Sequence, residues 1–126
     1  MKRLVFAAAL LTALLLAALF NGYVSQQLAD SLASRLEQSQ QLAQDGRWEQ
    51  ARILTEQVHD HWQANHTYLH IFMRHSDTDE IQRSFLAVQE YLNLQEMDQY
   101  AAANADLIAQ IQLLAEMEQA TLVNVL

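Results

Sequence analysis

Residues 42–51, with the sequence LAQDGRWEQA, lie between two long helical patterns and set how the chain turns back on itself. Asp45 and Gly46 interrupt the patterns, and glycine suits the left-handed conformation that commonly ends a helix. A second helix is expected to begin near Arg47. Because brief links in helical proteins join antiparallel neighbours, this segment predicts a helical hairpin.

The same ten residues resemble the turn between the two helices of a tetratricopeptide repeat. In such a turn an aromatic residue starts the second helix and a small residue permits close packing, and Trp48 and Ala51 stand at these positions. No second copy follows at the period of about 34 residues that an array requires. We therefore interpret the segment as a similar hairpin and not as part of a repeat array.

Apolar residues at three- and four-residue spacing precede the turn, as on one face of a helix. They follow an uncharged apolar run, Leu4–Phe20, so the sequence predicts one helix from this run to about Gln44. The positions expected on the packed face are Val24, Leu28, Leu32, Leu36, Ser39 and Ala43.

The helix after the turn has an apolar stripe over almost seven turns. Trp48 and Trp62 are fourteen residues apart and fall on nearly the same face, so we interpret them as core residues and not as an aromatic ligand box. The stripe consists of Trp48, Ala51, Leu54, Val58, Trp62, Leu69 and Phe72.

The segment 75–80, HSDTDE, is typical of a helix start, with Ser76 or Asp77 as the cap and acids in the first turn. It lacks the glycine and the distant glutamate of a calcium-binding EF-hand loop. A third helix then carries Ile81, Phe85, Val88 and Leu92, with Leu86 and Tyr91 beside them. A fourth helix, which Asp98 can cap, carries Ala101, Ala105, Ile108, Ile111, Leu114 and Met117.

The composition agrees with an all-α fold. The 126 residues include no proline and two glycines, and β-branched residues are too sparse for a sheet. About 105 residues follow the apolar run, which is enough for one small domain. We predict a single transmembrane helix, with the anchor in residues 1–22, that continues into a four-helix bundle of two tetratricopeptide-like hairpins in residues 23–126.

The apolar run predicts a location in the membrane. Leu4–Phe20 has 17 residues, which as a helix cover about 26 Å, close to the roughly 30 Å of a hydrocarbon core. A cleaved signal peptide is the alternative, but its apolar part is shorter, about 7–15 residues, and small residues are not paired here as its cleavage site requires. We expect an uncleaved signal anchor.

Charge predicts the orientation and excludes one class of partner. Lys2 and Arg3 precede the run and the next basic residue is Arg35, so the N-terminus is expected in the cytoplasm and the bundle outside the cell membrane. The formal net charge is −8, and such an acidic domain repels nucleic acid and anionic lipid headgroups. Without cysteine, disulfides and thiolate metal sites are impossible.

Five histidines fall within seventeen residues of the second helix and the turn after it. On a helix, His59, His66 and His70 lie within about 40° of one another, which makes them candidates for a metal or for protons. However, Thr67 follows His66 where the zinc motif HExxH needs glutamate. The favoured interpretation is structural, at the edge of the hairpin, and we expect no metal, cofactor or catalytic residue. The five are His59, His61, His66, His70 and His75.

Over nearly its full length the chain resembles the small bacterial membrane-anchored helical proteins grouped as domain of unknown function family 4363. The likeness rests on the basic apolar start, Gly46-Arg47-Trp48-Glu49-x-Ala51, Trp62, His75-x-Asp77-x-Asp79-x-Ile81, Tyr91-Leu92 and the ending Leu122–Leu126. Thr78 departs from the pattern, in which an aliphatic residue is expected, while His75 and Asp79 match it. The resemblance implies a single-span helical protein and no assigned activity.

No catalytic motif is present in the sequence. It contains neither a Gly-rich phosphate loop nor a Ser/His/Asp motif in a recognisable context. We expect a non-enzymatic accessory or scaffold protein whose bundle contacts another membrane or envelope protein, or a second copy of the chain. The alternative is a module that responds to pH or to a divalent cation through the histidine-rich second helix.

Overall fold

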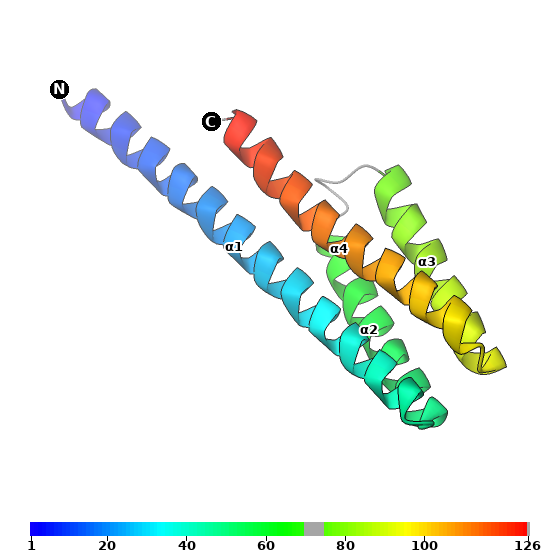
Figure 1. Ribbon diagram of the computed structural model, residues 1–126. Helices are drawn as coiled ribbons and strands as arrows, with labels where there is room; N and C mark the ends of the chain where they lie inside the picture. Colours follow the sequence, from blue (N-terminus) through cyan, green and yellow to red (C-terminus); the bar gives the residue numbers. More distant parts are fainter. Residues whose placement is uncertain (70–74, 126) are drawn as a thin grey trace.

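Four α-helices joined by short links make up the described part of the chain (Figure 1). The structure is a computed structural model that describes residues 1–69 and 75–125, without the side chains of residues 21, 25, 66–69, 75–77 and 118–125. The helices are α1 (Lys2–Gln44), α2 (Trp48–Leu69), α3 (His75–Leu94) and α4 (Met97–Val125). Because no strand occurs in these two ranges, the predicted all-α fold is confirmed.

The helices pack as two hairpins, α1 with α2 and α3 with α4, and each helix contacts its two neighbours in a ring. Helix α4 runs antiparallel to α1, so both chain ends lie at one end of the molecule, where α1 extends beyond the other helices (Figure 1). Both hairpin turns lie at the opposite end. The link between α2 and α3 is in the undescribed residues 70–74.

Helix α1 ends at the predicted turn. The N–H of Gly46 donates to the carbonyl of Ala43 at 3.0 Å, and the N–H of Arg47 donates to the carbonyl of Leu42 at 2.8 Å. This pair of bonds is the Schellman motif, which satisfies the last carbonyls of a helix. The φ angle of Gly46 is +81°, so its predicted left-handed conformation is confirmed.

The turn between α3 and α4 uses the same motif without a glycine. The N–H of Gln95 donates to the carbonyl of Leu92 at 3.2 Å, and the N–H of Glu96 donates to the carbonyl of Tyr91 at 3.1 Å. Gln95 has a φ of +55°. A residue with a Cβ is strained in this region, so this turn is held in its conformation by the helices that it joins.

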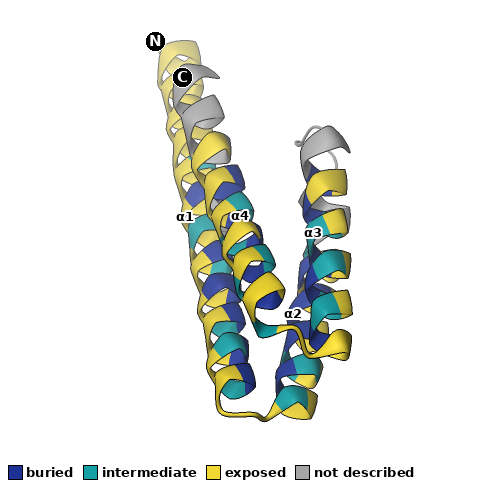
Figure 2. Cartoon of the chain, turned by 45° about the vertical axis from the view of Figure 1, so that its right-hand side comes forward, coloured by how far each residue is buried: buried dark blue, intermediate teal, exposed yellow. Residues whose placement is uncertain are grey.

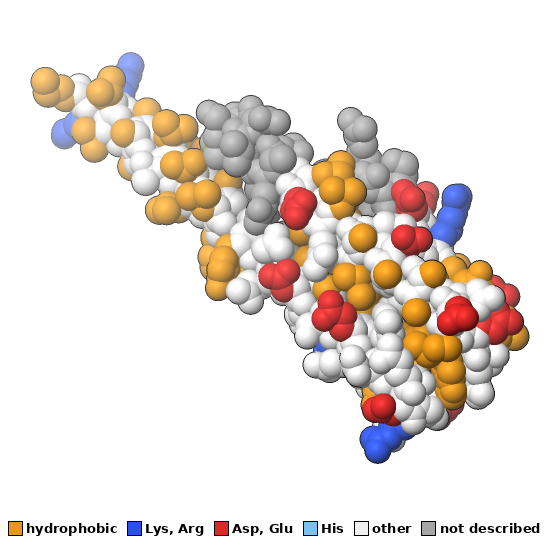
Figure 3. Space-filling view, in the orientation of Figure 1, with side chains coloured by type: hydrophobic (Ala, Val, Ile, Leu, Met, Phe, Trp, Pro, Cys, Tyr) orange, Lys and Arg blue, Asp and Glu red, His pale blue; other side chains and the backbone are white. Residues whose placement is uncertain are grey.

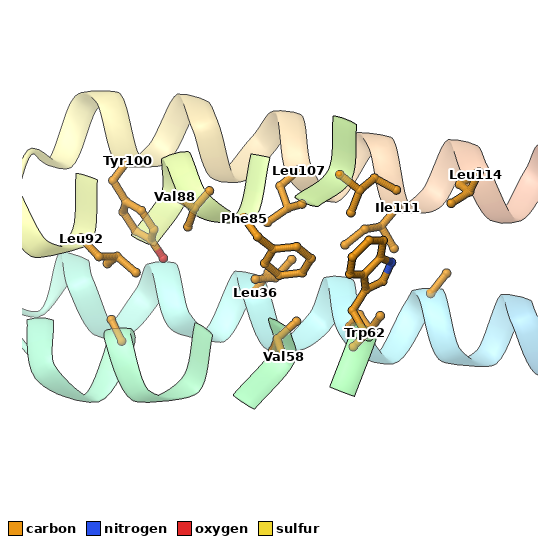
Figure 4. Packing of buried hydrophobic residues seen from close by; sticks show 14 of the residues in the cluster. Leu36, Val58, Trp62, Phe85, Val88, Leu92, Tyr100, Leu107, Ile111 and Leu114 are labelled. Atoms are coloured by element: carbon orange, nitrogen blue, oxygen red, sulfur yellow. The ribbon is translucent and has the colours of Figure 1, made fainter. Parts of the chain in front are cut away.

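The core lies where the four helices face one another (Figure 4). Phe85 of α3 is fully buried at its centre, and the ring of Trp62 from α2 lies 5.7 Å from it, centroid to centroid. All four positions predicted to pack from the third helix are buried. The larger members of the core are Leu32, Leu36, Val58, Trp62, Ile81, Phe85, Val88, Leu92, Tyr100, Leu107, Ile111 and Leu114.

The buried stripe of α4 differs from the predicted one. Ile111 and Leu114 are buried as expected, but Ala105 is exposed and Met117 is 44% exposed. The reason is that the stripe passes through the polar Asn104, which a search for apolar spacing does not select. The buried positions are Tyr100, Asn104, Leu107, Ile111, Leu114 and Ala115.

The stripes of the first two helices are confirmed near the turn and need correction away from it. In α1 the predicted Val24 is 45% exposed, because at this height the buried side of the helix passes through Gly22 and Ala29. In α2 the polar Thr55 and His59 are buried in addition to Ala51, Val58 and Trp62. The predicted contributions of Leu69 and Phe72 lie outside the described side chains.

Three predicted capping residues lie inside their helices. Helix α3 is described from His75 onward, so Ser76 and Asp77 lie within it. Helix α4 begins at Met97, so Asp98 also belongs to a first turn. An acidic side chain in a first turn still stabilises the helix, since it lies near the positive end of the helix dipole.

Candidate functional site

The first turns of α1 consist of exposed residues, most of them apolar (Figure 2). Leu4 is 81% exposed and Phe20 is 69% exposed, and no part of the most apolar window of α1 is buried. Helix α1 is long and apolar enough to cross a membrane. A contiguous apolar surface of this extent marks a site that a membrane or a protein covers.

Polar groups flank this apolar surface at both ends (Figure 3). Lys2 and Arg3 lie at the tip of α1, and acidic side chains are spread over the bundle. At the bundle end, Tyr23 is 62% exposed, and its hydroxyl accepts a hydrogen bond from Nε2 of Gln27 at 3.1 Å. Aromatic residues with a polar tip are typical of the boundary between hydrocarbon and water.

A buried group of hydroxyls joins three helices inside the bundle. Ser39 of α1 donates from Oγ to the carbonyl of Ala51 at 2.8 Å. Its only proton is used there, so Thr55 at 2.7 Å and Tyr100 at 3.2 Å donate to Ser39 Oγ. We call Ser39, Thr55, Tyr100 and the neighbouring Asn104 the buried polar centre.

The phenol of Tyr100 is kept neutral by its surroundings. Burial raises the pKa of Tyr100, and the hydrogen bonds with Ser39 and Thr55 oppose this rise only in part. The ring also meets Trp48 edge to face, with the centroids 6.3 Å apart. Tyr100 therefore acts as an uncharged donor that ties α4 to α1.

Asn104 fixes the position of α4 along α1. Its Nδ2 donates to the carbonyl of Leu36 at 3.1 Å and to Oε1 of Gln40 at 3.0 Å. Its Oδ1 is buried with no hydrogen-bond partner among the described groups. A polar side chain in an apolar helical interface favours one register, because a shift by one turn would leave its donor unpaired as well.

Both nitrogens of His59 are bonded to neighbouring glutamines. Nε2 donates to Oε1 of Gln82 at 3.0 Å, and Nδ1 accepts from Nε2 of Gln89 at 3.3 Å. The ring stacks on Phe85 with the centroids 4.7 Å apart. In this arrangement neither nitrogen of His59 is open to a metal ion.

Of the other histidines, His61 has a described side chain, and it does not join His59. His61 faces α1, where its Nδ1 lies 3.5 Å from a guanidinium nitrogen of Arg35. His66, His70 and His75 lie outside the described side chains, so the predicted histidine flank is untested beyond His59. Within the described residues, no three histidine, aspartate or glutamate side chains are placed to hold a metal ion.

The sequence matches the family described as Domain of unknown function (DUF4363) over residues 19–125. The chain belongs to this family. No curated protein and no solved structure matches it. Since the match begins near the end of the apolar run and includes α2, α3 and α4, the DUF4363 match follows the bundle and its junction with the apolar part of α1.

The turn residues singled out from the sequence occupy defined places in this DUF4363 bundle. Ala51 is fully buried and supplies the carbonyl that Ser39 binds, and Trp48 packs against the core from a half-buried position. Asp79 is exposed near the start of α3, next to Thr78, which is buried. Apolar periodicity missed Thr55 and Asn104; their only signal is a polar residue at four-residue spacing from a predicted core position.

Proposed function

We propose that this chain is a single-pass membrane protein whose extracytoplasmic bundle is a non-enzymatic scaffold for another membrane or envelope protein. The observation that carries the proposal is the exposed apolar surface of the first part of α1, on the same unbroken helix whose later turns pack in the core of the bundle. Lys2 and Arg3 before the apolar run support an orientation with the N-terminus in the cytoplasm.

A bilayer is the environment that suits residues 4–20. Ten large apolar side chains of this range are well exposed, and they surround the helix and do not form one stripe. A surface helix that packs on a protein has one apolar face, whereas a helix that is apolar all round is covered on all sides. Lipid chains supply such a cover.

The interior of the bundle supports a scaffold more than a reaction centre. The buried hydroxyls of Ser39, Thr55 and Tyr100 bond to one another and to the backbone, and His59 is bonded on both nitrogens. These groups join helices, and such satisfied networks specify one packing arrangement. They leave no nucleophile paired with a free base.

The surface of the bundle indicates the kind of partner. After residue 22 the sequence has five arginines against fifteen acids, and Arg52 already pairs with Glu49 and Glu56 on α2. An acidic surface attracts a basic one and speeds encounter with it. We therefore propose a partner with a lysine- or arginine-rich face.

The absence of lysine from the bundle allows a clean test. A carbodiimide joins carboxylates to amines, and the only lysine of the chain is Lys2, on the other side of the proposed span. An adduct on the bundle that exceeds the monomer by the mass of a protein must therefore contain an amine of another protein, whereas coupling to an aminolipid adds only the mass of one lipid. We expect a discrete adduct in the membrane fraction, retained in a Lys2→Arg variant.

Three results would contradict the proposal. Loss of the protein from carbonate-washed membranes would contradict the proposed anchor. A reporter fused after Leu126 that is active only in the cytoplasm would contradict the proposed orientation. Recovery of monomer alone after carbodiimide treatment, with an intact anchor, would contradict the scaffold role.

A further inference from the structure

Hydrogen bonds fix the height of α4 along α1. Tyr100 bonds to Ser39, and Asn104 bonds to Leu36 and Gln40. In an antiparallel pair, each residue forward on α4 corresponds to one residue back on α1, at about 1.5 Å per step. Position 118 of α4 then lies level with about residues 21–26 of α1, and position 125 with about residues 14–19.

The packing of the two helices follows this register toward the anchor. Leu114 and Ala115 of α4 are buried, as are Ala29 and Gly22 of α1. Helices α1 and α4 are in contact, and Figures 1 and 2 both show α4 running beside α1 toward this end of the molecule. Helix α4 continues to Val125, so it extends past the level of Gly22.

The composition of both helices changes at the same height. On α1, the apolar run ends at Phe20 and the boundary residue Tyr23 follows. On α4, Glu116 and Glu118 are the last charged residues, and residues 119–126, QATLVNVL, have no charged side chain. Charged side chains are unfavourable in hydrocarbon, so a helix end without them can reach the boundary between headgroups and hydrocarbon.

We propose that the last two turns of α4 lie at the boundary between headgroups and hydrocarbon in the outer leaflet, beside α1. This inference rests on the proposed membrane anchor. The register places Val125 up to about 9 Å beyond Phe20 toward the hydrocarbon, within the depth of about 5–10 Å that interfacial helices reach. The bilayer then holds the bundle at two points, a full span and a shallow contact. Because Glu116 and Glu118 directly precede these turns, the contact is suited to zwitterionic headgroups and not to anionic ones, which would repel the two carboxylates.

The lack of cysteine makes the test specific, because one introduced cysteine carries the only label. The full chain is reconstituted in phosphatidylcholine vesicles with an environment-sensitive fluorophore on Val123→Cys. Leu113→Cys, on the same helix but 55% exposed and about 15 Å farther from the membrane, is the matched control. Leu11→Cys reports on the anchor itself.

Lipids that carry a nitroxide near the headgroup or near the end of the acyl chain then quench the fluorophore when it lies at the same depth as the nitroxide. We expect loss of Val123 fluorescence with the shallow nitroxide, loss of Leu11 fluorescence with the deep one, and no loss at Leu113. Quenching at Leu11 without quenching at Val123 overturns the proposal and leaves the anchor intact. No quenching at Leu11 defeats the anchor and the proposal together.

A further variant separates contact with lipid from contact with protein. Thr121→Cys lies in the same two turns and repeats the measurement if Val123→Cys fails to melt cooperatively. A blue-shifted label that no nitroxide lipid quenches at either position would show that protein covers the end of α4, which also overturns the proposal.

Discussion

The hairpins α1–α2 and α3–α4 bury residues at the same distances from their turns. Gly46 and Gln95 occupy the same place in the two Schellman motifs, so an offset of 49 residues relates one hairpin to the other. The following buried residues of the first hairpin are each matched with a buried residue 49 positions later: Ala29 with Thr78, Leu32 with Ile81, Leu36 with Phe85, Ser39 with Val88, Ala43 with Leu92, Ala51 with Tyr100, Thr55 with Asn104, Val58 with Leu107, and Trp62 with Ile111. The two hairpins thus use one packing scheme.

The differences at matched positions show what each hairpin adds. Ala51 is small where Tyr100 is large, and Leu36 is smaller than Phe85, so the two halves fill one core between them. Ser39 accepts hydrogen bonds where Val88 is apolar. The first hairpin alone continues into a long exposed helix. The two hairpins therefore share one packing scheme, whereas the polar acceptor and the exposed apolar segment of α1 belong to the first hairpin.

The largest expected effect comes from the pair at the centre of the core. Phe85→Ala should lower the free energy of unfolding by about 3–5 kcal/mol and Leu36→Ala by about 2–5 kcal/mol, because each leaves a cavity. Urea unfolding of the full chain in detergent, followed by circular dichroism, measures both. Leu86→Ala, at a 53% exposed neighbour, should change it by less than about 0.5 kcal/mol. A similar decrease in the free energy of unfolding for Leu86→Ala and Phe85→Ala would contradict the central place of Phe85 in the core.

The next effect tests the segment that only the first hairpin has. Leu14→Arg should oppose membrane insertion by about 3 kcal/mol, since charge at the centre of a span is unfavourable. The fraction retained in carbonate-washed membranes measures it. Ser34→Arg, at an exposed position of the same helix, serves as the control and should leave that fraction unchanged. Equal retention of both variants would argue against a span.

A smaller effect should follow from removal of the polar acceptor. Ser39→Ala leaves the buried hydroxyls of Thr55 and Tyr100 without their acceptor and should lower the free energy of unfolding by about 1–3 kcal/mol. Thermal melts compare it with Ser31→Ala, which removes an exposed hydroxyl from the same helix. A loss no greater than that of the control would show that the buried polar centre does not stabilise the bundle.

The phenol of Tyr100 should make the bundle sensitive to alkali. Its pKa is raised in the folded state by burial, so its contribution to stability is complete below the ordinary value of about 10 and is lost as the pH rises through the raised pKa. Melting temperatures measured from neutral pH to above that range should fall in the wild type and fall less in Tyr100→Phe. An identical alkaline decline in the two proteins would contradict this account.

The smallest effect concerns the two turns. Gln95→Gly should raise the free energy of unfolding by up to about 1 kcal/mol, because glycine adopts the left-handed conformation without strain. Gly46→Ala is the reverse change at the matched position and should lower it by a similar amount; nothing lies within 4 Å of the added Cβ, so the cost is in the backbone. Denaturant melts should show changes of opposite sign in the free energy of unfolding for the two variants.

The sequence predicted what depends on neighbours along the chain. Asp45-Gly46 located the first turn, and the spacing of Ile81, Phe85, Val88 and Leu92 located the packed face of α3. It did not predict the buried polar centre, because Tyr100 and Ser39 are 61 residues apart and their bond depends on how the hairpins meet. The second turn was located only as a break in pattern, since Gln95 carries no sign of a left-handed residue.

Helix α1 is continuous from Lys2 to Gln44, so it connects the membrane segment to the far turns as one lever arm. From Phe20 to Gln44 it rises about 36 Å. With residues 4–20 in a bilayer, a change of about 10° in helix tilt, of the size that bilayer thickness produces, would move the Asp45-Gly46 turn by about 6 Å. With the proposed anchor and partner, the reach of the bundle would therefore depend on the thickness of the membrane.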